Sequence, residues 1–116
     1  MTYKIKSRIW IESDGHVLLG EGRVRLLKAI DETGSLSKAA KLLQLSYKKA
    51  WHLLDSMNRS AREPVTINST GGKDGGGTLL TNYGKRLITI FDDINKNCWA
   101  FLDDQIEKME TLDNSE

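Results

Sequence analysis

The first eleven residues alternate between less polar and more polar side chains. The odd positions from Tyr3 to Ile11 are mostly apolar, and the even positions are mostly charged. This period of two predicts a half-buried strand over 3–11. The Asp-Gly pair at 14–15 favours a tight turn, so we expect a hairpin with a short return strand over 16–19.

A helical spacing replaces this alternation from Glu21 onward. Val24, Leu27 and Ile30 fall near one face of the predicted helix. Gly34 suits the left-handed backbone conformation of a C-terminal cap, so we expect the helix to end just before it.

Serine residues mark the starts of two further helices. Ser35 or Ser37 caps a short helix over 38–43, and Ser46 caps a third helix that runs to about residue 61. The residues expected to hold this pair of helices on the core are Leu43, Leu45, Ala50, Leu54 and Met57.

A glycine-rich loop separates two short strand patterns that follow Pro64, a residue that imposes extended backbone. We expect strands over 65–67 and 78–80, and five of the ten glycines lie between them within 70–77. The loop lacks the Gly-x-x-x-x-Gly-Lys-Ser/Thr signature of a phosphate-binding P-loop, and no strand-to-helix junction follows its glycines. It therefore predicts the tip of a hairpin, and a floppy hairpin without a ligand is the alternative.

The final helix carries a long apolar stripe. Thr81 caps it, and its periodic part, 82–109, would be about 42 Å long at about 1.5 Å per residue, about twice what a small core needs. We therefore expect 82–112 to be a dimerisation helix, with packing on its own domain as the alternative, and 112–116 to be disordered. The expected dimer seam consists of Leu87, Phe91, Ile94, Cys98 and Phe101, widened by Trp99 and Leu102.

The length of 116 residues is enough for one core, so we expect a single domain over 1–116. No apolar run approaches the ~20 residues that span a bilayer, and the N-terminus lacks a signal-peptide pattern, which predicts a cytoplasmic protein without membrane contact. The single cysteine, Cys98, excludes an internal disulfide framework and a multi-cysteine metal site. No spacing of Ser/His/Asp, Cys/His or paired carboxylates supports catalysis, so we expect neither an enzyme nor a bound metal or cofactor.

The net charge of +1 conceals an uneven distribution along the chain. Residues 38–86 hold nine basic and three acidic side chains, whereas residues 87–116 hold two basic and eight acidic ones. A basic middle joined to an acidic end indicates a module that faces a polyanion and an element that faces elsewhere. Ordinary solvated helix faces are the alternative interpretation.

Two helices joined by a tight turn and followed by a basic hairpin are the element order of a winged helix-turn-helix. The predicted fold class is mainly α with a small β content, with an N-terminal β-hairpin, a three-helix core, a glycine-rich wing hairpin and a long C-terminal dimerisation helix. An α-helix fits the major groove of B-DNA, and its first residues reach base edges. With the core residues of the third helix turned inward, its outward face carries Tyr47, Lys48, Trp51, His52 and Asp55.

Two of these residues have a second interpretation. Trp51 is also suited to the core, because Ala50 and Leu54 flank the same turn. His52 is also consistent with an ordinary surface histidine, and no second histidine lies near enough in sequence to suggest a metal site.

Five groups of residues carry a resemblance to a known family. They are Gly34-Ser35-Leu36-Ser37-Lys38-Ala39-Ala40, Leu45-Ser46-Tyr47-Lys48 with Ala50-Trp51, Met57-Asn58, Thr70-Gly71-Gly72-Lys73 with Gly75-Gly76-Gly77, and Leu80-Thr81-Asn82-Tyr83-Gly84. Together they resemble the N-terminal domain of the molybdate-responsive regulators of the ModE family, over roughly residues 20–90. The helix-turn-helix half by itself is also similar to LysR-type regulators.

The resemblance implies a winged-helix homodimer that binds double-stranded DNA and acts as a sequence-specific transcriptional regulator. The recognition helix at about 46–61 would lie in the major groove, and the wing at 65–80 would contact the backbone. Lys73 on the wing would supply sequence-independent attraction, together with Lys38, Lys41, Lys85 and Arg86. The candidate DNA-binding residues are Ser37, Lys38, Ser46, Tyr47, Lys48, Lys49, Trp51, His52 and Lys73.

Three departures from the family pattern limit this inference. The oxyanion-binding domains of molybdate regulators have no room in this chain, so sensing would fall to an unknown effector or partner chain. Ile67 and Asn68 stand where the wing strand of such regulators tends to carry arginine and glutamate, and Asp74 stands where they have glycine. We therefore expect a weaker phosphate contact from the wing, and a winged helix that binds protein without reading bases is the alternative function.

Overall fold

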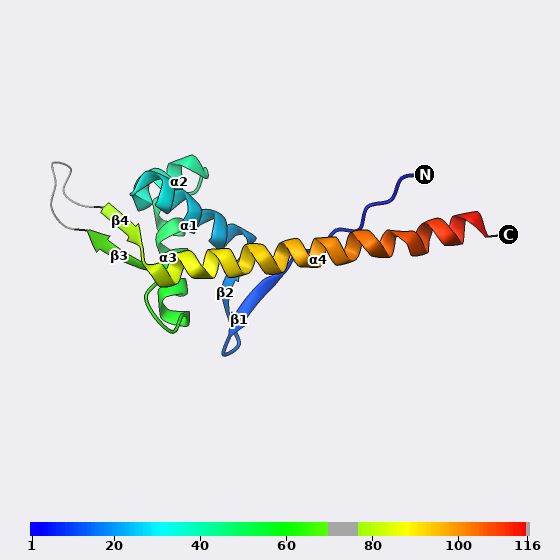
Figure 1. Ribbon diagram of the computed structural model, residues 1–116. Coiled ribbons are helices and arrows are strands. Elements are labelled where there is room, and N and C mark those ends of the chain that lie inside the picture. Colours follow the sequence, from blue (N-terminus) through cyan, green and yellow to red (C-terminus); the bar gives the residue numbers. More distant parts are fainter. Residues whose placement is uncertain (70–76, 116) are drawn as a thin grey trace.

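The computed structural model describes residues 1–69 and 77–115 (Figure 1). Strands β1, Trp10–Ser13, and β2, His16–Gly20, form an antiparallel hairpin that pairs Ser13 with His16. Asp14 and Gly15 form its turn with φ angles of 52° and 83°, as the Asp-Gly pair predicts. The predicted strand over 3–11 is wrong for residues 3–9. Strand β2 ends at Gly20, which pairs with Trp10, so the residues before Trp10 have no partner in β2.

The preceding segment, residues 1–9, lies along the last helix of the chain instead (Figure 1). The phenol of Tyr3 donates a hydrogen bond to the carboxylate of Asp113, and Ser7 Oγ lies 3.5 Å from Cys98 Sγ. The odd positions from Tyr3 to Ile9 are half-buried and the even ones are exposed. The alternation in the sequence therefore marks one face that meets a helix.

Three helices follow the first hairpin: α1, Glu21–Thr33, α2, Leu36–Leu42, and α3, Tyr47–Ser60. Gly34 caps α1 with a φ of 71°, as predicted. Helix α2 begins two residues before the predicted start, because Ser35 is its cap and Ser37 lies within it. Ser46 caps α3 as expected.

The core lies between these helices, β2 and the base of the wing. Leu26, Leu27, Ile30 and Met57 are fully buried at its centre, and Leu19 contributes from β2. Burial of such side chains contributes roughly 1.5–3 kcal/mol each, so the core fixes α3 on α1.

The second hairpin consists of β3, Thr66–Ser69, and β4, Gly77–Leu80, which are antiparallel with Ile67 opposite Leu79. Each predicted strand is present with slightly shifted ends. The predictions for Lys73 and Asp74 fall on 70–76, which lie outside the described residues.

Helix α4, Asn82–Asn114, is capped by Thr81 and extends well beyond the rest of the protein (Figure 1), so the molecule measures 70 × 29 × 22 Å. The expectation of disorder from Leu112 is wrong as far as Asn114, because the helix continues to that residue beside the N-terminal segment. Among the described residues, no helix is both long and apolar enough to cross a membrane.

Candidate nucleic-acid interface

The turn between α2 and α3 brings the two helices close together. Gln44 adopts a φ of 58°, and the backbone N–H of Leu45 donates to the carbonyl of Ala40 at 2.8 Å. Ala40 and Ala50 are almost completely buried. Because both side chains are small, the helices can pack in the helix-turn-helix arrangement.

The first turns of α3 form an exposed and basic surface. Ser46 Oγ accepts a hydrogen bond from the backbone N–H of Lys49 at 3.0 Å, and the first turn of α3 holds no acidic residue. The positive end of the helix dipole therefore faces outward without a compensating carboxylate, which favours a phosphate nearby. The predicted recognition residues on this exposed surface are Ser46, Tyr47, Lys48, Lys49, Trp51 and His52.

Trp51 projects from this surface, so the alternative interpretation as a core residue is wrong. Its exposed fraction is 46%, and its ring meets that of His52 edge to face, with centroids 5.3 Å apart and planes at 79°. Tyr47 is 57% exposed. Two large aromatic side chains on one exposed helix face lie outside the core and are accessible to a macromolecular partner.

The predicted α2 residues lie at the edge of this surface. Ser37 and Lys38 are both exposed in the first turn of α2. Because Ser35 caps the helix by accepting a hydrogen bond from the backbone N–H of Lys38 at 3.1 Å, the hydroxyl of Ser37 is not the cap. It is exposed in the first turn of α2, and its contact with DNA stays a prediction.

A hollow of about 240 Å³ lies between part of α3 and the wing. Its polar lining includes Asn58, Thr66 and Thr78, which the sequence did not single out as contacts, and Asn68, one of the wing positions that depart from the family pattern. Alternation along β3 and β4 was the available signal, because every second residue of a strand points to the same side. The remaining lining residues are Leu36, Tyr47, Trp51, Leu54 and Asp55.

Asn58 holds the wing against α3. Its Oδ1 accepts hydrogen bonds from the backbone N–H groups of Val65 and Thr66 at 2.8 and 3.4 Å, and its Nδ2 donates to Thr66 Oγ1 at 3.2 Å. All these groups are at least partly buried, where a lost hydrogen bond costs about 1–3 kcal/mol. Helix α3 and the wing therefore form one unit.

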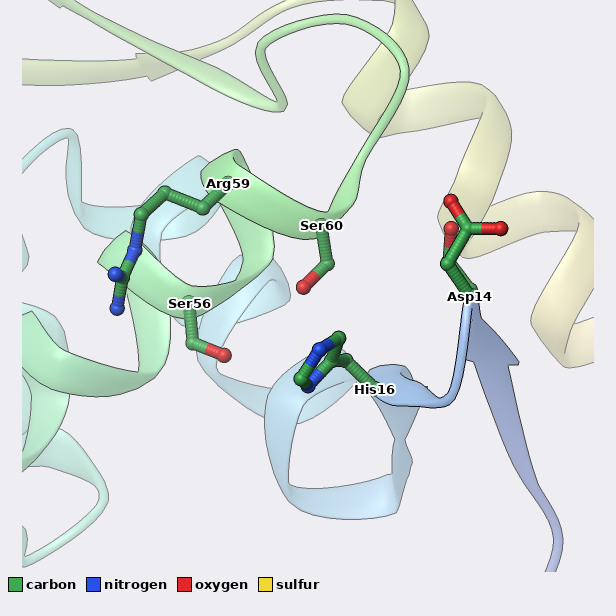
Figure 2. A pocket seen from close by; sticks show the side chains of 6 residues that line it. Asp14, His16, Ser56, Arg59 and Ser60 are labelled. Carbon is green, nitrogen blue, oxygen red and sulfur yellow. The ribbon is translucent and has the colours of Figure 1, made fainter.

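A second hollow, of about 340 Å³, lies at the opposite end of α3, beside the turn of the first hairpin (Figure 2). His16 points toward Ser56 and Ser60, whereas Arg59 points away and binds Asp55 at 3.0 Å. Ser56 accepts a hydrogen bond from Arg23 at 3.0 Å, and partial burial lowers the pKa of that guanidinium. Arg59 at this hollow is thus paired with a carboxylate, and no group of three metal-binding side chains occurs among the residues that the structure describes.

The predicted dimer stripe on α4 divides into covered and exposed parts. Phe91 is 3% exposed and belongs to the core of its own domain, so its assignment to the seam is wrong. Leu87 also packs against that core. Cys98 and Leu102 are half-buried, Cys98 beside Ser7.

The exposed part of α4 follows a face that the sequence predicted only in part. Ile94 and Phe101 are 46% and 61% exposed, as a seam residue requires before it meets a partner. Ile90 and Leu112, at 48% and 64%, extend the same face and were missed. Steps of four, seven and eleven residues return to one side of a helix, so these four residues form one stripe, called the α4 stripe below.

Taken together, the three-helix core, the exposed face of α3 and the β3–β4 hairpin define a winged helix-turn-helix. Comparison with curated proteins gives the relationship more closely. The molybdenum transport protein ModE of Azotobacter vinelandii is 39% identical over 103 residues, which cover 89% of this chain and 38% of that protein.

Two further relatives are named as regulators. The transcriptional regulator ModE of Haemophilus influenzae is 41% identical over 92 residues, covering 79% of this chain and 33% of that protein. The DNA-binding transcriptional dual regulator ModE of Escherichia coli is 46% identical over 70 residues, covering 60% and 27% respectively. No protein-family model matches the chain.

The chain is thus homologous to ModE transcriptional regulators over most of its own length. It spans between about a quarter and two fifths of the length of these relatives. The resemblance drawn from the residue motifs is confirmed.

Proposed function

We propose that this protein is a sequence-specific DNA-binding transcriptional regulator that acts as a homodimer. Helix α3 enters the major groove, and the wing contacts the backbone. The observation that carries the proposal is the exposed first half of α3, which presents Tyr47, Lys48, Trp51 and His52 on one surface. Major-groove readout requires such a helix with polar and aromatic side chains at its start.

The distribution of charge supports a polyanionic partner for this surface. Lys38 and Lys41 on α2 and Lys48 and Lys49 on α3 are exposed. No acidic residue occupies the first turn of either helix. Lysines near a phosphate backbone release condensed counterions and attract DNA of any sequence, while the aromatic and imidazole groups between them can contact base edges.

The proposal of a homodimer rests on the α4 stripe. Burying Ile90, Ile94, Phe101 and Leu112 needs a second surface, and a second copy offers the same stripe across a two-fold axis. The half of α4 before Phe101 carries basic residues together with acidic ones, whereas the half after it is strongly acidic. Antiparallel pairing about Phe101 therefore separates the two most acidic ends, which parallel pairing would bring together.

The test is a selection of double-stranded DNA from a random library by the purified chain, followed by a salt titration of the selected sequence. We expect a defined motif with two related half-sites and an affinity that falls linearly with salt on a double-logarithmic plot. Recovery of unrelated sequences, or an affinity independent of salt, would favour a winged helix that binds protein instead.

A further inference from the structure

One residue between α3 and β3, Val65, has both of its backbone polar groups held by other elements. Its N–H donates to Asn58 Oδ1 of α3 at 2.8 Å, and its carbonyl accepts from the N–H of Thr81, the cap of α4, at 3.0 Å. Its side chain is fully buried. A single peptide segment therefore joins the recognition helix to the start of the long helix.

The contact on the α4 side is unusually close. A Cβ placed on Gly84 would lie 2.3 Å from the carbonyl oxygen of Val65, which real side chains do not tolerate. Thr81 adds a second bond by donating from Oγ1 to the carbonyl of Pro64 at 2.7 Å, and Thr81 Oγ1 itself accepts from the N–H of Gly84 at 3.0 Å. The first turn of α4 therefore has no room to slide along this segment.

Apolar packing alone links the two helices less directly. Helix α4 packs on α1 and β4, whereas α3 packs on α1, α2 and β2. Packed side chains resist separation but permit small rotations, whereas hydrogen bonds of fixed direction define an orientation. Figure 1 shows how far α4 extends from the joint, so a small rotation at its first turn becomes a large displacement at its far end.

We propose that Asn58 and Gly84 are positioning residues that set the angle between the recognition helix and α4 through Val65, and thereby select the spacing between two DNA half-sites. The proposal rests on the homodimer and DNA binding proposed above. If two copies pair through α4, the angle at this joint fixes the distance and rotation between their two α3 helices. Only a matching half-site spacing then lets both helices bind at once.

The experiment compares Asn58→Ala with the wild-type chain on three probes drawn from the wild-type selection. They are the selected DNA, the same DNA with about 5 base pairs inserted between the half-sites, half a helical turn, and a single half-site. The wild type should prefer the selected spacing about 100-fold, the scale of bivalent binding. For Asn58→Ala this preference should fall below about tenfold, while single half-site affinity changes less than about threefold.

Two further variants separate positioning from general damage. Asn58→Asp keeps acceptors for the N–H groups of Val65 and Thr66 and can accept from the Thr66 hydroxyl, so it should restore much of the preference. Asn82→Ala removes an exposed amide from the first turn of α4 and should behave as the wild type.

The outcomes distinguish this inference from the proposed function. Failure of the wild type to select DNA or to dimerise would overturn both, whereas an unchanged spacing preference in Asn58→Ala would overturn the inference alone. If Asn58→Ala does not fold, Gly84→Ala, which displaces α4 from Val65, takes its place. If neither folds, Thr66→Val decides, because it removes the hydroxyl that accepts from Asn58 Nδ2 and so orients the amide toward Val65. The spacing preference should then fall, and an unchanged preference would overturn the inference.

Discussion

The amide of Thr78 in β4 donates a hydrogen bond of 3.0 Å to the carbonyl oxygen of Gly34, the residue that caps α1. The neighbouring Gly77 lies so close that a Cβ there would approach the same oxygen to 2.4 Å. The wing is thus fastened at two points, to the end of α1 through Gly34 and to α3 through Asn58.

Substitution of Gly77 should therefore loosen the wing. Gly77→Ala should destabilise the protein by about 1–3 kcal/mol, because neither backbone can move far without breaking the Thr78 bond. Gly22→Ala is the matched control, since a Cβ at Gly22 meets open space, and it should be neutral or stabilising by up to about 1 kcal/mol. Urea unfolding measures both, and equal stabilities would contradict the close contact.

Lys48 is expected to read the DNA sequence. Lys48→Ala should weaken binding to the selected DNA by about 1–3 kcal/mol and binding to random DNA much less, because a base contact is lost only at the specific site. Lys108→Ala, on the exposed far half of α4, should change neither affinity. Equal loss on both DNAs would make Lys48 a phosphate contact.

Phe101 is expected to hold two copies together. Phe101→Asp should convert the dimer to a monomer in analytical ultracentrifugation, because two carboxylates would face each other in an apolar seam. The winged helix should stay folded, since Phe101 is exposed in the single chain. Ala100→Asp adds the same charge beside the stripe and should leave the dimer intact, and a wild-type monomer at micromolar concentration would end this proposal.

Phe91 should respond in a different way from Phe101, although both belonged to the predicted seam. Its burial in the domain core means that Phe91→Ala should reduce the free energy of unfolding by about 3–5 kcal/mol. Thermal unfolding measured by circular dichroism compares the two variants, and a small effect at position 91 would contradict its place in the core.

Gln44 has a left-handed backbone conformation in the helix-turn-helix turn, with a φ of 58°. Gln44→Gly should stabilise the protein, or at least cost nothing, because the side chain disfavours this conformation by about 1 kcal/mol. Gln105→Gly within α4 should instead destabilise by about 1 kcal/mol. A similar loss from both variants would show that the turn has no such strain.

Tyr3 should report the attachment of the N-terminal segment to α4 through its titration. The hydrogen bond to Asp113 raises the pKa of the phenol, because it stabilises the protonated form. The hydrogen bond is therefore fully present below the ordinary tyrosine pKa of about 10. It is lost as the pH rises through the raised pKa that Tyr3 has in the folded chain. In Asp113→Asn the pKa of Tyr3 should fall in an NMR titration, and an unchanged value would mean that the contact does not form.

Local signals in the sequence determined most of the secondary structure and the helix-turn-helix. The caps Ser46 and Thr81, the Asp14-Gly15 turn and Gly34 act on their own neighbours, so their consequences can be derived from a short stretch of chain. Homology then confirmed what the residue motifs had indicated. The exposure of Lys48 and His52 followed from helical periodicity in the same way.

Tertiary structure decided every feature that depends on which distant surface a residue meets. Period-two alternation could not distinguish a strand partner from α4 as the neighbour of residues 3–9, and helical periodicity could not divide the α4 stripe from the buried Phe91. Whether Trp51 was core or surface depended on how α3 sits on α1. The joint at Val65 could not be predicted for the same reason. Val65 bonds to Asn58 and Thr81 through its backbone N–H and carbonyl, which every residue except proline carries, and only the fold brings these particular groups together.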